Sequence, residues 1–159
     1  MTSGFALAWE PLVRYADFSG RSRRSDLLFF YVLTILLNVL IDWAGLLAGL
    51  HDYRWLSLAF TLMLLCPWAA LAVRRLHDSG RGGWWLLLGL PVLALNLWDD
   101  WRRLGDPFAL SVQSSLPILV EIPLALALLA LIVLLFWEDE EGPNCYGPNP
   151  RYDSEETTA

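Results

Sequence analysis

The sequence contains no lysine, so all eleven of its basic residues are arginines. It has only two cysteines and two histidines, which is too few for a disulfide framework or for a closed zinc site with four ligands. Charged residues make up 18% of the chain, compared with roughly 25% in soluble domains. These shortages argue against a disulfide-rich secreted protein, a structural zinc protein and a domain with a highly charged surface.

Hydrophobic residues, in contrast, make up 56% of the 159 residues, compared with roughly 45–50% in soluble domains. Most of them fall in four apolar runs, at residues 27–49, 55–73, 84–98 and 116–137. A helix of about 20 residues crosses a hydrocarbon core of about 30 Å, so three of these runs are long enough to span it. The third run reaches only about 22 Å, so it thins the bilayer, extends at one end or fails to span.

The fold class that follows is an all-α integral membrane protein with four transmembrane helices in one membrane domain, residues 27–137. Before this domain, residues 1–26 are predicted to form a cytoplasmic or interfacial segment, with Ser25 as the N-cap of the first span. After it, residues 138–159 are predicted to form an acidic tail in which prolines and glycines exclude regular helix.

The arginines are divided unequally between the two sides of such a protein. Both termini and the second connection share one side, which holds eight arginines: Arg14, Arg21, Arg23, Arg24, Arg74, Arg75, Arg81 and Arg151. The other side holds three: Arg54, Arg102 and Arg103. Since the side with more basic residues in its short loops stays in the cytoplasm, we predict cytoplasmic N- and C-termini.

Residues 74–85, Arg-Arg-Leu-His-Asp-Ser-Gly-Arg-Gly-Gly-Trp-Trp, are predicted to be a short connection at the cytoplasmic surface. One reading of its His77-Asp78 pair is metal-dependent catalysis, but the only other histidine, His51, falls on the opposite side. The other reading is a polar turn, in which Asp78 caps the third helix or pairs with Arg74 or Arg75, while His77 binds a backbone carbonyl. We favour the turn and predict no catalytic residue, no metal and no cofactor.

Three motifs in order suggest a known family. They are residues 15–25 (YADFSGRSRRS), 73–85 (VRRLHDSGRGGWW) and 142–150 (GPNCYGPNP). Together they resemble the bacterial inner-membrane family of unknown function typified by the YhaH and YhaI proteins. The resemblance implies a small multi-pass protein of the inner (plasma) membrane with four predicted spans. It brings no established activity, cofactor or catalytic residue.

The chain departs from the family pattern at three places. Leu27 and Leu28 stand where an aromatic residue usually follows the first basic turn, and Cys145 stands where a basic residue is usual. The connection formed by residues 99–115 is longer than the usual tight link between the last two helices. Because Cys66 lies in an apolar run and Cys145 in a polar tail, we expect two free thiols.

The cytoplasmic motifs suggest a binding surface, because arginine forks match phosphate geometry and basic groups near a membrane attract anionic headgroups. Its predicted members are Arg21, Arg23, Arg24, Arg74, Arg75, His77, Asp78, Arg81, Asn144 and Tyr146. The expected partners are the lipid bilayer with its anionic headgroups, a membrane-protein partner or a second copy of this chain. Nothing in the sequence suits nucleic acid. The favoured function is therefore a non-enzymatic membrane scaffold or accessory protein.

Polar residues within the apolar runs support a competing function. Asn38, Asp42 and Glu121 interrupt predicted spans, and intramembrane carboxylates are functional candidates by default. A small transporter or channel subunit could use them. The simpler interpretation is that each lies near a helix end and reaches interfacial water, or accepts a hydrogen bond from Arg102 or Arg103.

The nine tryptophans mostly mark the ends of the apolar runs, as residues of an interfacial belt do. Trp43 and Trp68 lie away from those ends, so we predict that both pack between helices.

Overall fold

The structure is a computed structural model that describes residues 12–49, 53–105 and 116–150. Its elements in chain order are α2 (Arg24–Leu47), α3 (Tyr53–Asp78), the 3-10 helix η1 (Gly83–Gly89), α4 (Leu90–Gly105) and α5 (Ile118–Leu135). The all-α prediction is confirmed.

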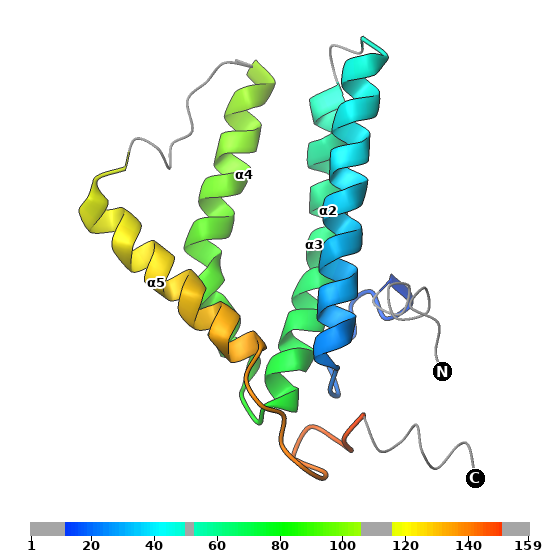
Figure 1. The fold of residues 1–159 in the computed structure, drawn as a ribbon, viewed down its shortest axis with the longest axis vertical. Helices are drawn as coiled ribbons and strands as arrows, with labels where there is room; N and C mark the ends of the chain where they lie inside the picture. The colour runs from blue at the N-terminus through cyan, green and yellow to red at the C-terminus, as the bar shows by residue number, and fades with distance from the viewer. Residues whose placement is uncertain (1–11, 50–52, 106–115, 151–159) are drawn as a thin grey trace.

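The helices run alternately up and down the molecule. α2 and α3 lie side by side and antiparallel, α4 rises beside them, and α5 slants back towards η1 (Figure 1). The start of α2, the ends of α3 and α5 and the start of η1 come together at one end, which we call the closed end. The opposite end, where α2 and α4 finish and α3 begins, is called the distal end.

Three of the described helices are long and apolar enough to cross a membrane: α2, the stretch Arg54–Asp78 of α3, and α5. Their large apolar side chains face outward, with Leu47 80% exposed and Leu119 82% exposed. Exposed apolar surface of this extent is stable only against lipid or another protein. With 16 residues, α4 is shorter than each of these three helices.

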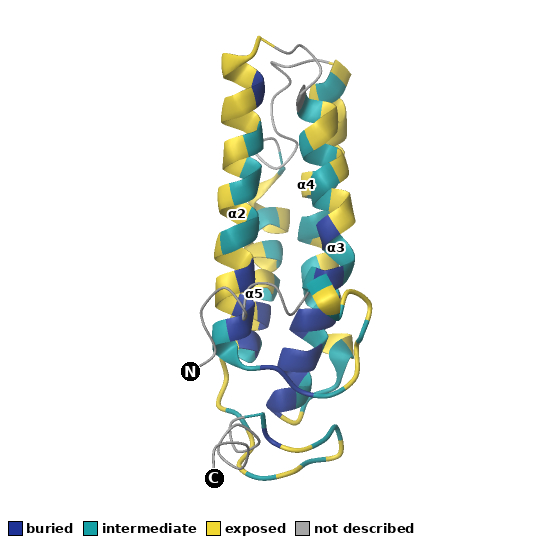
Figure 2. Cartoon of the chain, turned by 90° about the vertical axis from the view of Figure 1, so that its right-hand side faces the viewer, coloured by how far each residue is buried: buried dark blue, intermediate teal, exposed yellow. Residues whose placement is uncertain are grey.

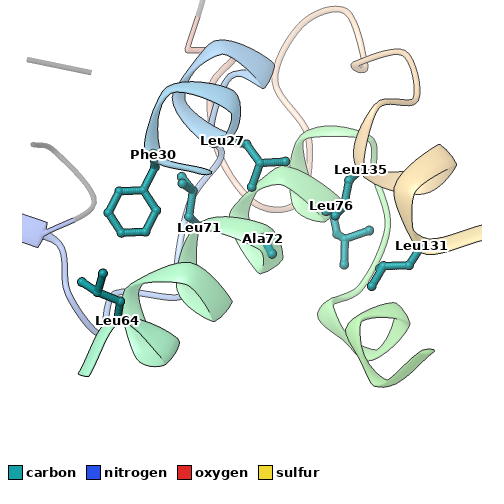
Figure 3. Close-up of a cluster of buried hydrophobic side chains, with 8 residues drawn as sticks. All are labelled: Leu27, Phe30, Leu64, Leu71, Ala72, Leu76, Leu131 and Leu135. Carbon is teal, nitrogen blue, oxygen red and sulfur yellow. The ribbon is translucent and has the colours of Figure 1, made fainter. Parts of the chain in front are cut away.

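The apolar core lies at the closed end. The buried cluster joins α2, α3 and α5 (Figure 3), and the dark, buried positions concentrate there (Figure 2). Its members are Leu27, Phe30, Leu64, Leu71, Ala72, Leu76, Leu131 and Leu135. The helices are therefore fixed to one another mainly at the end that carries the three sequence motifs.

The predicted loop at residues 74–85 is wrong in its first part, because α3 continues through Asp78. The helix stops in a Schellman motif: the Gly80 N–H donates to the His77 carbonyl (3.0 Å) and the Arg81 N–H donates to the Leu76 carbonyl (2.9 Å). Gly80 has φ +70°, which only glycine adopts readily. The four residues before Ser79 therefore lie on a rigid helix end, and the true connection is short.

The third apolar run also differs from its predicted bounds of 84–98. It begins as η1 and continues as α4 to Gly105, so the helical segment is extended at its distal end. The N-cap of α2 is Arg23 and not Ser25: the Asp26 carboxylate accepts from the Arg23 N–H at 2.9 Å.

The packing prediction for the two central tryptophans holds for only one of them. Trp68 packs against the buried cluster, as predicted. Trp43 is 59% exposed, so that prediction is wrong. Its position one turn before the end of α2 places it near the distal end with the other tryptophans found there.

Candidate functional site

The three sequence motifs converge at the closed end on one buried carboxylate. Arg21 comes from the turn before α2, Arg75 and Asp78 from the last turn of α3, and residues 135–150 from the end of α5 and the tail. We call this assembly the clasp: Arg21, Arg75, Asp78 and the segment 135–150 that they hold.

Asp78 is bound by two guanidinium groups at once. Arg21 Nε lies 2.7 Å from Asp78 Oδ1, and Arg75 Nη1 donates to Asp78 Oδ2. The three side chains are 1%, 0% and 4% exposed for Arg21, Arg75 and Asp78, respectively. The prediction that Asp78 pairs with Arg74 or Arg75 is confirmed, with Arg75 as the partner, whereas the bond to Arg21 was not anticipated.

The remaining guanidinium donors of these two arginines bind backbone carbonyls of the tail. Arg21 donates to the carbonyls of Gly142 and Glu140, each at 2.7 Å. Arg75 donates to the Leu135 carbonyl at 2.7 Å and to the Trp137 carbonyl. Since the last carbonyls of a helix have no partner within it, Arg75 serves as a C-terminal cap for α5.

His77 joins the same assembly through its ring and its backbone. Its ring stacks on Tyr146 with centroids 3.8 Å apart and planes 3° apart. Its Nδ1 lies 3.3 Å from the Gly20 carbonyl, as predicted for a histidine that binds backbone. Asn144 Nδ2 donates to the His77 carbonyl at 3.0 Å and to Glu140 Oε2 at 2.9 Å. The tail is thereby held flat against the end of α3.

The remaining arginines of the motifs surround this centre. Arg24 pairs with Asp139 at 2.7 Å and is 35% exposed, and Arg23 donates to the Pro150 carbonyl. Arg81 lies over the Trp137 ring, 5.0 Å from its centroid, in a cation–π contact. Arg74 is 1% exposed, so its side chain is buried in the interior, and its carbonyl accepts from the Ser22 N–H at 3.3 Å.

The first motif adds a smaller ion pair outside the clasp. Arg14 lies 2.6 Å from Asp17, and the two side chains are 34% and 38% exposed. Hydrogen bonds from the Ser19 hydroxyl and from Arg14 lower the pKa of Asp17 well below its usual range. This pair closes the turn that leads into Gly20, whose φ of +81° again suits glycine.

The structure thus brings all ten predicted surface residues to one end, but it places three arginines inside: Arg21, Arg74 and Arg75. The sequence prediction did not include Glu140 and Asp139, or Asn149, whose side chain donates to the Glu140 carbonyl at 3.1 Å. The run of four acidic residues after the last apolar residue could have indicated Asp139 and Glu140, because seven arginines at this end require counter-charges.

The polar residues within the apolar runs lie outside the clasp, on α2 and at the start of α5, and make different contacts. Asn38 and Asp42, one turn apart on α2, face α3: Thr61 Oγ1 donates to Asn38 Oδ1 at 3.3 Å, and Ser57 Oγ donates to Asp42. Such bonds stabilise helix pairs in membranes. Glu121 lies in the first turn of α5, where the helix dipole favours a carboxylate. The transport hypothesis stays a prediction.

Metal binding was also considered. No group of three or more His, Cys, Asp or Glu side chains in residues 12–49, 53–105 and 116–150 is arranged to hold a metal ion. The second histidine, His51, lies outside the described residues.

Comparison with known proteins identifies the family. The family described as "Protein of unknown function (DUF805)" matches residues 15–148. Inner membrane protein YhaI of Escherichia coli (strain K12) is 39% identical over 77 residues, which cover 48% of this chain and 64% of YhaI. Inner membrane protein YhaH of the same organism is 34% identical over 86 residues, covering 50% and 68%. No solved structure matches.

A third relative extends the match over most of the chain. Uncharacterized protein YiiR of Escherichia coli (strain K12) is 32% identical over 133 residues, which cover 82% of this chain and 84% of YiiR. The inner-membrane relatives and the three membrane-length helices agree with the predicted multi-pass location in the bacterial inner membrane. The family match contains all the residues of the clasp up to Pro148, and the chain belongs to the DUF805 family of bacterial inner-membrane proteins.

Proposed function

We propose that this chain is a non-enzymatic scaffold or accessory protein with four membrane spans and with the clasp in the cytoplasm. The observation that carries the proposal is that the buried charged side chains of the clasp bind one another. Arg21 and Arg75 share the Asp78 carboxylate in the interior, Asp139 lies 3.9 Å from Arg75, and the other guanidinium nitrogens of the two arginines bind backbone carbonyls. A catalytic or transport site needs such groups to meet a substrate, whereas a structural joint needs them buried and satisfied.

The chain path supports four spans. The ends of α3 and α5 meet at the closed end, where Arg75 binds the Leu135 carbonyl. If α3 and α5 both cross the membrane towards this end, the segment between them has to return to the distal side. η1 and α4 are the described helices of that segment, so they supply the fourth crossing.

The length and tryptophans of that segment agree with a crossing. From Trp84 in η1 to Trp101 in α4, a 3-10 rise of about 2.0 Å and an α rise of 1.5 Å per residue give roughly 28 Å. This is close to the hydrocarbon thickness of about 30 Å. Trp84 is 82% exposed and Trp101 is 55% exposed, as interfacial residues are.

The arginine distribution supports a cytoplasmic clasp. Seven arginines from the described residues lie at the closed end, whereas three lie at the distal end. Reporter fusions test this orientation. A reporter that is active only in the periplasm should be silent after Ala159 and active within residues 106–115. Activity after Ala159 would overturn the proposed topology: with silence within residues 106–115 it would reverse the orientation, and with activity at both places it would contradict four spans.

The partly exposed rim of the clasp is the surface that we propose meets anionic headgroups. Arg24 is 35% exposed, and Arg81 lies beside Trp137, which is 51% exposed. A guanidinium beside an interfacial tryptophan is well placed to contact a lipid phosphate. The buried arginines are excluded from this role by their place in the interior.

Native mass spectrometry of the detergent-solubilised protein with phosphatidylglycerol tests the headgroup proposal. The variant Arg24→Gln with Arg81→Gln should bind the lipid about thirtyfold more weakly, at about 1 kcal/mol per lost basic group. Arg14→Gln is the control, because Arg14 lies at the same end, is 34% exposed and pairs with Asp17 three residues away. Equal retention by the two variants would contradict headgroup binding and would leave a protein partner for the rim.

A further inference from the structure

An apolar cavity of about 460 Å³ opens between α3 and α4 near the distal end. It is lined by Leu58, Leu62, Ala94, Leu97, Trp98 and Trp101. These residues are far from the clasp along both helices, so the cavity is independent of the contacts described above. In water such a surface would be unfavourable, because nearly all of its lining is carbon.

The depth of the cavity distinguishes between its candidate occupants. Along α4 the lining extends from Trp101 to Ala94, which is roughly 10 Å at 1.5 Å per residue. One leaflet contributes about 15 Å of hydrocarbon, half of the bilayer core. A partner helix would need a contact over most of the 30 Å core. The cavity therefore suits one acyl chain of a single leaflet.

Charged side chains of both signs lie next to the cavity on its distal side. Arg102 and Arg103 come directly after Trp101 and are exposed. Asp100 is also exposed, and it lies within electrostatic range of Arg103 and Asp42. Arg54 Nη1 donates to the Arg103 carbonyl at 3.0 Å and so ties the start of α3 to the end of α4. A headgroup with one phosphate and one ammonium complements this mixture of charges.

We propose that this groove binds one molecule of a zwitterionic aminophospholipid from the leaflet at the distal end. The acyl chain lies between α3 and α4, the phosphate meets Arg102 or Arg103, and the ammonium meets Asp100. Trp101, which lines the groove, packs edge to face against Trp55 with ring centroids 5.8 Å apart. The proposal rests on the crossing of the membrane by α4. If that crossing fails, the reporter fusions show it, whereas failure of lipid binding leaves them unchanged.

Native mass spectrometry after delipidation and exchange tests the proposal. The variant Arg24→Gln with Arg81→Gln, in which the basic rim of the clasp is removed, is incubated with equal amounts of phosphatidylethanolamine and phosphatidylglycerol, and the substitutions below are made in it. We expect one retained phosphatidylethanolamine per chain in excess over phosphatidylglycerol. Ala94→Trp fills the groove and should abolish this retention, whereas Leu126→Trp, on an exposed position of α5, should leave it unchanged.

A second variant addresses the headgroup without altering the groove. Arg102→Gln with Arg103→Gln should lower the bound fraction about tenfold, as expected for the loss of a hydrogen bond to a charged group. Preferential retention of phosphatidylglycerol by the variant that lacks the basic rim, or equal retention by Ala94→Trp and Leu126→Trp, would overturn the proposal. Dimers that are lost in Ala94→Trp would also overturn it, because the groove would then bind a second copy.

Discussion

Replacing Asp78 with asparagine tests the central element of the structure. The substitution keeps the size of the side chain but leaves Arg21 and Arg75, which are 1% and 0% exposed, without their shared counter-charge. Removing one partner of a buried ion pair costs about 3–5 kcal/mol. We therefore expect Asp78→Asn to lower the free energy of unfolding by about 3–5 kcal/mol.

The sign of the effect is as informative as its size. Asp78 is the last residue of α3, where the negative end of the helix dipole disfavours a carboxylate by about 0.3–1 kcal/mol. Without the two arginines, neutralising Asp78 would therefore stabilise the helix slightly. A large loss in Asp78→Asn is therefore expected only if the carboxylate is held by buried guanidinium groups.

Unfolding in mixed micelles by titration with dodecyl sulfate, followed by the fluorescence of the nine tryptophans, measures this free energy. Asp17→Asn is the matched control, because it breaks an arginine pair whose side chains are 34% and 38% exposed, where about 0–1 kcal/mol is expected. If the two variants unfold alike, or if Asp78→Asn is more stable than the unmodified chain, the clasp does not hold the fold together.

Three further changes have expected outcomes. Tyr146→Ala removes the ring stacked on His77, so the tail should be cleaved faster in limited proteolysis, with a stability loss of about 0.5–1.5 kcal/mol. Gly83→Val adds a side chain where a Cβ would come within 2.9 Å of the Val73 side chain on α3. The same dodecyl sulfate titration should show the free energy of unfolding lowered by about 1–3 kcal/mol. Gly105→Ala is the neutral control, because a Cβ there meets nothing within 4 Å. Asn38→Leu should cost only about 0.6 kcal/mol by that titration, the average for an interhelical bond in a membrane; a loss several times larger would assign Asn38 more than a packing role.

The sequence predicted the helices well because their signal is strong. Long apolar runs have few alternatives to membrane helices, and three of the four runs are found as helices of membrane length. Helix ends were less predictable. The end of α3 was placed at residue 73 because hydropathy stops there, although the Asp78-Ser79-Gly80 sequence marks a helix terminus with glycine at C′.

The sequence predicted some residues of the clasp, among them Arg21, Arg75 and Asp78, but it missed Asp139, Glu140 and Asn149 and did not predict the geometry. The motifs are far apart in the chain, and periodicity within one run carries no information on which arginine faces which acid. The sequence therefore suggested a basic surface, whereas the structure buries Arg21 and Arg75 on Asp78. The Glu140 and Gly142 carbonyls could not be anticipated, because backbone acceptors have no signature in side-chain chemistry.

The geometry of the clasp also gives a physical reason for arginine at its buried positions in a chain without lysine. Arg21 reaches four acceptors from three nitrogens: the Asp78 carboxylate and the carbonyls of Asp78, Glu140 and Gly142. A lysine ammonium has three donors on a single atom and no planar fork, so it has too few donors to give one hydrogen to each of these four acceptors. Arg75 bridges in the same way between Asp78 on its own helix and the terminal carbonyls of α5. Arginine at these two positions therefore ties the helix ends to the tail beside the apolar cluster that packs α2, α3 and α5, and this joint closes the bundle at one end.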